Sequence, residues 1–124
     1  MVGAHSIVTS CIATGNLGDG IRANAGSVVT NCVAADNTVG GIHLQGSGGI
    51  VQGSTVRGSM MGLRASFGDS SITECAAVVN STGILAPNSL IRGNLSVGNI
   101  TADIASPPYE RWAPRATGSE RSAP

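Results

Sequence analysis

Apolar and polar positions along the chain repeat with a period of about 21 residues. A glycine, an aliphatic residue, a mostly polar residue and a small or aliphatic residue recur together at this interval. The copies are Gly20-Ile21-Arg22-Ala23, Gly41-Ile42-His43-Leu44, Gly62-Leu63-Arg64-Ala65, Gly83-Ile84-Leu85-Ala86 and the degraded Asp103-Ile104-Ala105-Ser106. The inward-outward-inward order of the last three positions has period two, which predicts a β-strand with one buried face.

Three further columns of residues have the same period. The first contains only β-branched residues: Val8, Val29, Val51, Ile72 and Ile91. Three positions later stand Cys11, Cys32, Ser54, Cys75 and Asn94. Five positions after these stand Asn16, Asn37, Ser59, Asn80 and Asn99. The spacings within each of these three columns are 21, 22, 21 and 19, so each repeat gains and loses residues as one structural unit.

Each repeat therefore predicts one coil of a parallel β-solenoid, in which successive coils stack about 4.8 Å apart. The β-branched column should fill the interior. The Asn column should form an amide ladder at a turn, where Asn tolerates the left-handed conformation. The glycine should lie where the backbone bends into the next strand. One register stays open: Ile12, Val33 and Leu95 directly follow the Cys column, whereas Val56 stands one place later.

The repeat resembles the right-handed parallel β-helix proteins of the pectin-lyase-like superfamily, whose bacterial members commonly read V-x-x-N-x-V-x-x-N-x-x-x-G-I in each coil. The closest copies are Val29 to Ile42 and Ile91 to Ile104, with Cys or Ser often replacing the first Asn. The resemblance covers residues 6 to about 106. It implies an all-β fold, a right-handed parallel β-helix (solenoid) of about five coils. It does not imply one activity, because the superfamily includes lyases, hydrolases, epimerases, tailspikes and inert repeats.

The domain organisation follows from where the repeat ends. Residues 1–106 are expected to form the β-helix. Residues 107–114 are rich in proline and aromatic residues, and Tyr109 and Trp112 are expected to cover the last coil or the side of the helix. Residues 115–124 have the composition of a flexible tail.

The usual N-terminal capping helix of the superfamily is missing, so we expect self-association as a homo-oligomer through coil ends or sheet faces.

Charge and hydropathy narrow the range of partners. Seven arginines balance seven acids, so no global field attracts nucleic acid or a membrane, and neither is expected as a partner. The chain contains no apolar run of the roughly 20 residues that span a bilayer and no signal peptide. An extracellular or cell-surface location is expected only if the chain is part of a longer secreted protein. Arginine without lysine, with abundant alanine and glycine, suggests a GC-rich bacterial source.

The outward positions of the glycine-containing strand are the candidate binding site. They stack Arg22, His43 and Arg64, followed by Leu85. Beside them run Asn24, Gln45, Ser66 and Pro87. A basic stripe flanked by amides suits an anionic ligand such as a uronic acid or phosphate, and Arg22, Asn24, His43, Gln45 and Arg64 are its candidate contacts. Alternatively, the stripe is an ordinary solvated face that happens to be basic. Stacked like charges about 5 Å apart repel, which favours a binding role for the stripe over an ordinary solvated face.

No catalytic, metal or cofactor site is assigned from the sequence. The candidate acids Asp19, Asp36, Asp69, Glu74 and Asp103 occupy different columns and do not pair as glycosidase carboxylates do. Asp19 is the nearest to the basic stripe, three residues before Arg22. Metal binding is not expected, because there is no C-x-x-C motif and His5 and His43 are far apart. The cysteines are expected to be buried free thiols rather than a disulfide.

These patterns favour a non-catalytic β-helix module with a structural or binding role, with an anionic polysaccharide as candidate ligand and self-association as a second expectation. The alternative is a truncated carbohydrate-active enzyme of the polysaccharide lyase or glycoside hydrolase type. The sequence favours a non-enzymatic role, because it contains neither a pair of catalytic acids nor a cluster of acids that could bind calcium.

Overall fold

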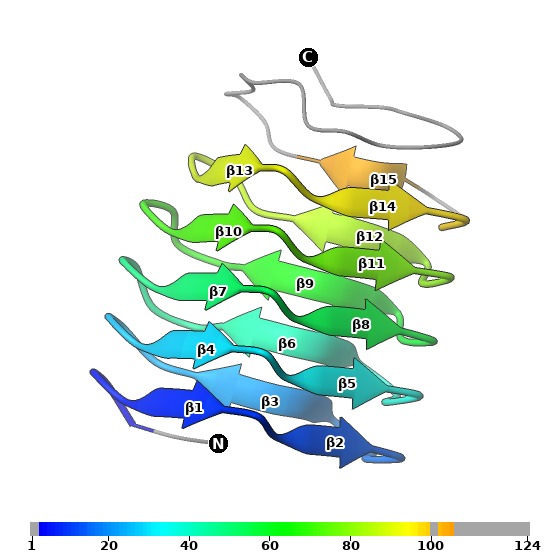
Figure 1. The fold of residues 1–124 in the computed structure, drawn as a ribbon, viewed down its shortest axis with the longest axis horizontal. Coiled ribbons are helices and arrows are strands. Elements are labelled where there is room, and N and C mark those ends of the chain that lie inside the picture. Colours follow the sequence, from blue (N-terminus) through cyan, green and yellow to red (C-terminus); the bar gives the residue numbers. More distant parts are fainter. Residues whose placement is uncertain (1–2, 100–101, 106–124) are drawn as a thin grey trace.

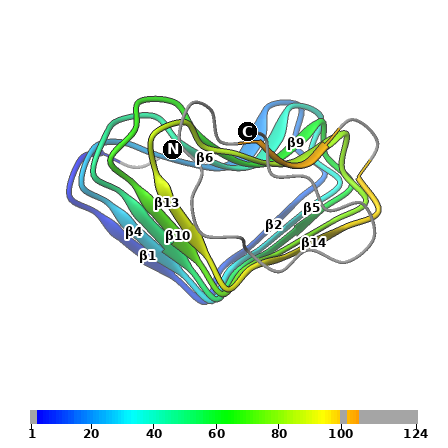
Figure 2. The same cartoon turned by 90° about the horizontal axis from the view of Figure 1, so that it is seen from above.

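The structure is a computed structural model that describes residues 3–99 and 102–105, in which every regular element is a short β-strand. The strands form three parallel sheets, and consecutive strands along the chain belong to different sheets. Figure 1 shows the turns stacked on one another. Seen down the stack, the three sheets surround one interior (Figure 2).

Each sheet contains five parallel strands stacked along the solenoid. The first sheet contains β1 (Ile7–Thr9), β4 (Val28–Thr30), β7 (Ile50–Gln52), β10 (Ser71–Thr73) and β13 (Leu90–Arg92). The second contains β2 (Ile12–Thr14), β5 (Val33–Ala35), β8 (Thr55–Arg57), β11 (Ala76–Val78) and β14 (Leu95–Val97). The third contains β3 (Asp19–Ala23), β6 (Gly40–Leu44), β9 (Met61–Ala65), β12 (Thr82–Leu85) and β15 (Ala102–Ala105).

The number of turns is slightly lower than expected from the repeat. Five strands in a sheet are separated by four intervals, so the described solenoid makes about four turns rather than about five. The all-β, right-handed parallel solenoid itself is confirmed. The expected capping segment 107–114 and tail 115–124 lie outside the described residues.

The core is a stack of small and aliphatic side chains. Val29, Val51 and Ile72 are fully buried and pair in register across the first sheet, as their column predicts. The open register of the second sheet is settled by Ala34, Val56, Ala77 and Ser96, which are all fully buried. The position two residues after the Cys column therefore faces the interior, and Ile12, Val33 and Leu95 point outward.

The Asn column forms the predicted ladder at the turn between the second and third sheets. Asn37 Oδ1 accepts a hydrogen bond from Asn16 N at 3.0 Å, and Asn80 Oδ1 accepts one from Ser59 N at 2.9 Å. The expectation that these Asn residues are left-handed is wrong. The left-handed residue is the one before each of them: Gly15, Asp36, Gly58, Val79 and Gly98. The ladder residues instead use their amides to bind the backbone of the turn below or above.

The regular spacing of glycine in the third sheet has a different reason from the expected bend. Gly41 lies inside β6, and a β-carbon there would lie 2.8 Å from Val56 Cβ and 2.7 Å from Gly62 O. The following residue, Ile42, is also fully buried. Two consecutive positions thus face the interior, and only glycine fits the first of them. The inward-outward alternation of the strand is interrupted at this point.

Cysteine occupies a structural column. Cys32 and Cys75 are buried free thiols, as expected, whereas Cys11 on the first turn is an exposed free thiol. Burial raises the pKa of the Cys32 thiol, and it raises that of Cys75 to about 11. Both buried thiols are therefore protonated at neutral pH and act as small apolar fillers.

Candidate functional site

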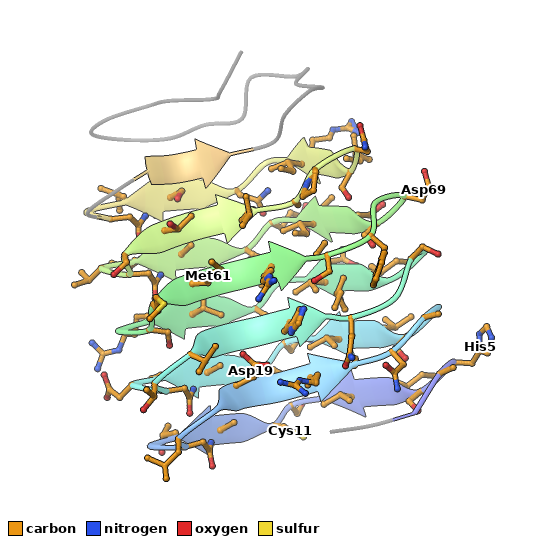
Figure 3. The ribbon with its side chains drawn as sticks, turned by 180° about the vertical axis from the view of Figure 1, so that it is seen from behind. His5, Cys11, Asp19, Met61 and Asp69 are labelled. Carbon is orange, nitrogen blue, oxygen red and sulfur yellow. The ribbon has the colours of Figure 1, made fainter. Side chains whose placement is uncertain are left out.

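The predicted stripe forms on the outer face of the third sheet. Arg22 on β3 pairs in register with His43 on β6, and His43 pairs with Arg64 on β9. Leu85 on β12 continues the column. Figure 3 views the molecule from the side of this sheet and labels Asp19, which begins β3. The repeat therefore predicted the stacking of the three basic residues correctly.

Asp19 joins the stripe, which the sequence did not predict. Its carboxylate oxygen Oδ2 accepts a hydrogen bond from Arg22 Nε at 3.0 Å and forms an ion pair with Arg22 Nη2 at 2.9 Å. The same oxygen lies 3.3 Å from His43 Nδ1. Only 4% of the Asp19 side chain is exposed. A buried carboxylate needs such partners, because an unpaired charge out of water costs several kcal/mol.

Two glycines make room for the Asp19 carboxylate. A β-carbon at Gly20 would meet the interior groups Asn37 Nδ2 and Ala34 Cβ, so Gly20 faces inward together with Ile21. This interruption of the alternation puts Asp19 and Arg22 on the same outer face. Across the sheet, a β-carbon at Gly40 would lie 2.5 Å from Asp19 Oδ1. The carboxylate therefore lies over the bare backbone of Gly40.

His43 is the most enclosed of the three stacked basic residues. Its residue exposure is 8%, and its Nε2 lies 2.7 Å from Ser66 Oγ. Burial lowers the pKa of His43 from 6.5; the nearby Asp19 opposes this shift, and Arg64 and Arg22 add to it. The imidazole is therefore neutral at neutral pH, and Arg22 is neutralised by Asp19. The positive charge of the expected stripe is concentrated on Arg64.

Arg64 borders a shallow hollow beside Ser66. The hollow has a volume of about 150 Å³ and is lined by Arg64, Ala65, Ser66, Leu85 and Pro87. Among the described residues, no carboxylate lies within ion-pairing distance of Arg64. The hollow thus combines one cation without an acidic partner, one hydroxyl and two apolar walls.

The two predicted amides flank this network and are half-buried. Asn24 follows β3 and Gln45 follows β6. The Oε1 atom of Gln45 is buried and has no hydrogen-bond partner in the described part of the chain. The structure therefore stacks Arg22, His43 and Arg64 on one face, with the two amides just beyond the ends of β3 and β6. Only Arg22 and His43 share direct contacts with the same group, Asp19.

Sequence reasoning missed the roles of Asp19 and Ser66. Ser66 was recognised as a neighbour of the stripe, but its contact with His43 crosses diagonally from one turn to the next. Asp19 is three positions from Arg22, and strict alternation would place the two on opposite faces. The usable signal was Gly20 between them, because a glycine in an otherwise regular strand marks an irregularity.

A second hollow lies on the first sheet. It has a volume of about 340 Å³ and is lined by Gln52, Thr73, Glu74, Arg92 and Gly93. Gln52 Nε2 donates a hydrogen bond of 3.4 Å to Glu74 Oε1. The sequence pattern does not predict a site at this hollow.

Within residues 3–99 and 102–105, no group of three or more His, Cys, Asp or Glu side chains is arranged to hold a metal ion. The same residues contain no helix with the length and apolar character needed to cross a membrane.

Comparison with known proteins identifies the architecture and no individual relative. Neither the curated proteins nor the solved structures contain a match to this chain. The family model for a right-handed β-helix region matches residues 1–84, which is more than half of the chain. With the three parallel sheets described above, this match shows that the chain belongs to the right-handed β-helix family.

Proposed function

We propose that the chain is a β-helix binding module whose third sheet recognises an anionic group of a polysaccharide, such as the carboxylate of a uronic acid. The observation that carries this proposal is the state of Arg64, which lines a hollow and has no acidic partner among the described residues. A guanidinium can hold a carboxylate through two parallel hydrogen bonds. Ser66 in the same hollow adds a hydroxyl suited to a sugar.

The other members of the stripe have supporting roles in this proposal. Arg22 is engaged by Asp19, and His43 is neutral, so neither brings a free charge to the ligand. Asn24 and Gln45 are candidate hydrogen-bonding groups at the edge of the site. Binding should therefore depend on one guanidinium rather than on three cations, with a correspondingly shallow dependence on salt concentration.

Calorimetric titration with an oligogalacturonate tests this proposal. We expect Arg64→Ala to weaken binding by roughly tenfold or more, because a hydrogen bond to a charged group contributes about 1.5–3 kcal/mol. Arg57→Ala is the matched control, since Arg57 is exposed on the outer face of the second sheet. Equal binding by the two variants, or no binding by the unmodified protein to several acidic oligosaccharides, would overturn the proposal.

Self-association is a second proposed property, and a specific observation favours it. On the first turn, Ile7, Ile12 and Leu17 are 75%, 76% and 87% exposed. In the described residues, β1, β2 and β3 pair with another strand on one side only. Exposed strand edges with apolar side chains are templates for pairing with another chain. The occupant we propose is the same edge of a second copy, related by a twofold axis.

Light scattering coupled to size exclusion tests this property. We expect the protein to be a dimer, and Ile7→Lys together with Ile12→Lys to convert it to a monomer. Ile50→Lys is the control, because Ile50 is an exposed residue of the same outward column in a middle turn. A monomer at high concentration would exclude self-association. Dissociation by the Ile50 variant would place the contact on the sheet face instead of the edge.

A further inference from the structure

We propose that Ser66 is a nucleophile, activated by His43 and oriented through Asp19, and that the third sheet hydrolyses small carboxylic esters. The three side chains form a continuous series: Asp19 Oδ2 lies 3.3 Å from His43 Nδ1, and His43 Nε2 lies 2.7 Å from Ser66 Oγ. A nucleophile bonded to a base that is itself bonded to a carboxylate is the arrangement that activates serine in unrelated folds. This activity goes beyond polysaccharide binding and does not depend on it.

The hydrogen-bond partners determine where the protons lie. Arg22 donates a hydrogen bond to Asp19 Oδ2 through Nε and forms an ion pair with it through Nη2, and a carboxylate in such a pair acts only as an acceptor. His43 Nδ1 must therefore carry the proton that faces Asp19. In a neutral imidazole the other nitrogen, Nε2, is then an acceptor, and Ser66 donates its hydroxyl proton to it. This is the protonation state in which a histidine can act as a general base.

The electrostatic environment keeps the base in this state. Burial lowers the pKa of His43 from 6.5, so the imidazole is neutral at neutral pH. The charged groups that face the ring are Asp19 on one side and Arg22 and Arg64 along the column. Asp19 stabilises the imidazolium that forms during the reaction, and the two arginines prevent it from persisting in the resting protein.

The hollow beside Ser66 supplies the substrate position. Its apolar walls, Leu85 and Pro87, suit a short acyl group, and about 150 Å³ limits that group to a few carbon atoms. Arg64 lines the same hollow and is the group available to stabilise a developing oxyanion. A small ester, such as an O-acetyl group, is therefore the substrate class that this site would take.

The reaction proceeds through an acyl-enzyme. Ser66 Oγ forms a bond to the carbonyl carbon while its proton passes to His43 Nε2. The ester C–O bond then breaks, and the departing alcohol takes this proton. Water attacks the acyl-serine and gives a proton to His43, and the bond between Ser66 and the acyl group breaks to release the carboxylic acid. The proton on His43 returns to Ser66, so the site is regenerated without another co-reactant.

Labelling with a fluorophosphonate and turnover of p-nitrophenyl acetate test the proposal on the whole chain. We expect one covalent adduct, located on Ser66 by mass spectrometry, and loss of both labelling and turnover in Ser66→Ala. Ser71→Ala is the matched control, because Ser71 is a half-buried serine in β10 on the first sheet. General-base assistance contributes about 10²- to 10⁴-fold, so His43→Gln should slow labelling at least 100-fold.

The rate of labelling and its pH dependence separate a positioning role of Asp19 from a merely structural one. Circular dichroism and thermal melting first establish that each variant is folded. In a folded Asp19→Asn variant, labelling should fall and the pH midpoint of the remaining reaction should shift, since the carboxylate no longer fixes the tautomer. An unlabelled native protein, or an adduct that persists in Ser66→Ala, would overturn the proposal.

The test is also independent of polysaccharide binding. Labelling and turnover are measured without any oligosaccharide present, so they report on the nucleophile alone. A protein that labels at Ser66 but binds no acidic oligosaccharide would retain the nucleophile and lose only the binding role.

Discussion

At the scale of single residues, Asp19 organises the outer face of the third sheet. Its carboxylate is almost fully enclosed and contacts both Arg22 and His43. Replacing one partner of a buried charge is costly, because the remaining charge stays out of water without compensation. The network therefore contributes to the structure of the sheet as well as to its chemistry, and its most sensitive member to pH is His43.

His43 should make the stability of the protein depend on pH. Its pKa in the folded chain is lowered from 6.5 by burial, so below about pH 6.5 the unfolded chain binds protons more readily than the folded chain. The contribution of the neutral His43 to stability is fully present above about pH 6.5 and is lost as the pH falls below that value. We expect the urea midpoint of the unmodified protein to drop more between about pH 7.5 and pH 5 than that of His43→Gln.

The exposed His5 provides the control for this measurement, because its ring is not enclosed by the third-sheet network. His5→Gln should follow the pH dependence of the unmodified protein. Identical pH profiles for the protein and for His43→Gln would show that the imidazole is not held in its neutral form by folding.

At the scale of elements, the strands of the third sheet differ from a regular period-two pattern. Gly20, Gly41 and Gly62 each face the interior next to an inward aliphatic residue. The repeat predicts the glycine column but not its place inside the strand, because spacing alone does not tell a turn from an interrupted strand. The interruption also explains why Asp19 was not assigned to the stripe, whereas Arg22, His43 and Arg64 were correctly stacked.

Gly41→Ala tests this explanation. The added β-carbon would lie within 3 Å of Gly62 O and of Val56 Cβ, both of which are packed in the interior. We expect urea denaturation to show a loss of about 1–3 kcal/mol, the usual cost of overpacking a core.

Gly18→Ala is the control for Gly41→Ala, since nothing lies within 4 Å of its added β-carbon. This variant should change the free energy of unfolding by less than about 0.5 kcal/mol. A neutral Gly41→Ala would mean that the third sheet relaxes at this position and that glycine is not required for packing.

At the scale of the whole molecule, each turn is stabilised by its neighbours. The architecture could be predicted because three columns with shared insertions leave few alternatives to stacked coils. The network around Asp19 could not, because it depends on diagonal contacts between turns and on side-chain conformation, neither of which a repeat period contains.

Neighbour stabilisation predicts a gradient of hydrogen exchange along the stack. Strands β7, β8 and β9 have a paired strand on both sides, whereas β1 and β2 have one on a single side in the described residues. Stacked-repeat proteins open from their ends because a terminal unit has one interface instead of two. We expect amides of the middle strands to exchange at least tenfold more slowly than those of β1 and β2. Uniform exchange rates would indicate that the stack opens in a single step.

The stacked architecture has a consequence for how the chain could change in length. Asp19, His43 and Ser66 come from three consecutive turns, separated by 24 and 23 residues. Duplicating a whole repeat elsewhere in the chain would lengthen the solenoid and leave its cross-section and this trio unchanged. Inserting a whole repeat between β3 and β6 would preserve every interior column. It would also separate the Asp19 carboxylate from the His43 imidazole by one additional turn. The fold tolerates any number of turns, whereas the chemistry of this face depends on their order.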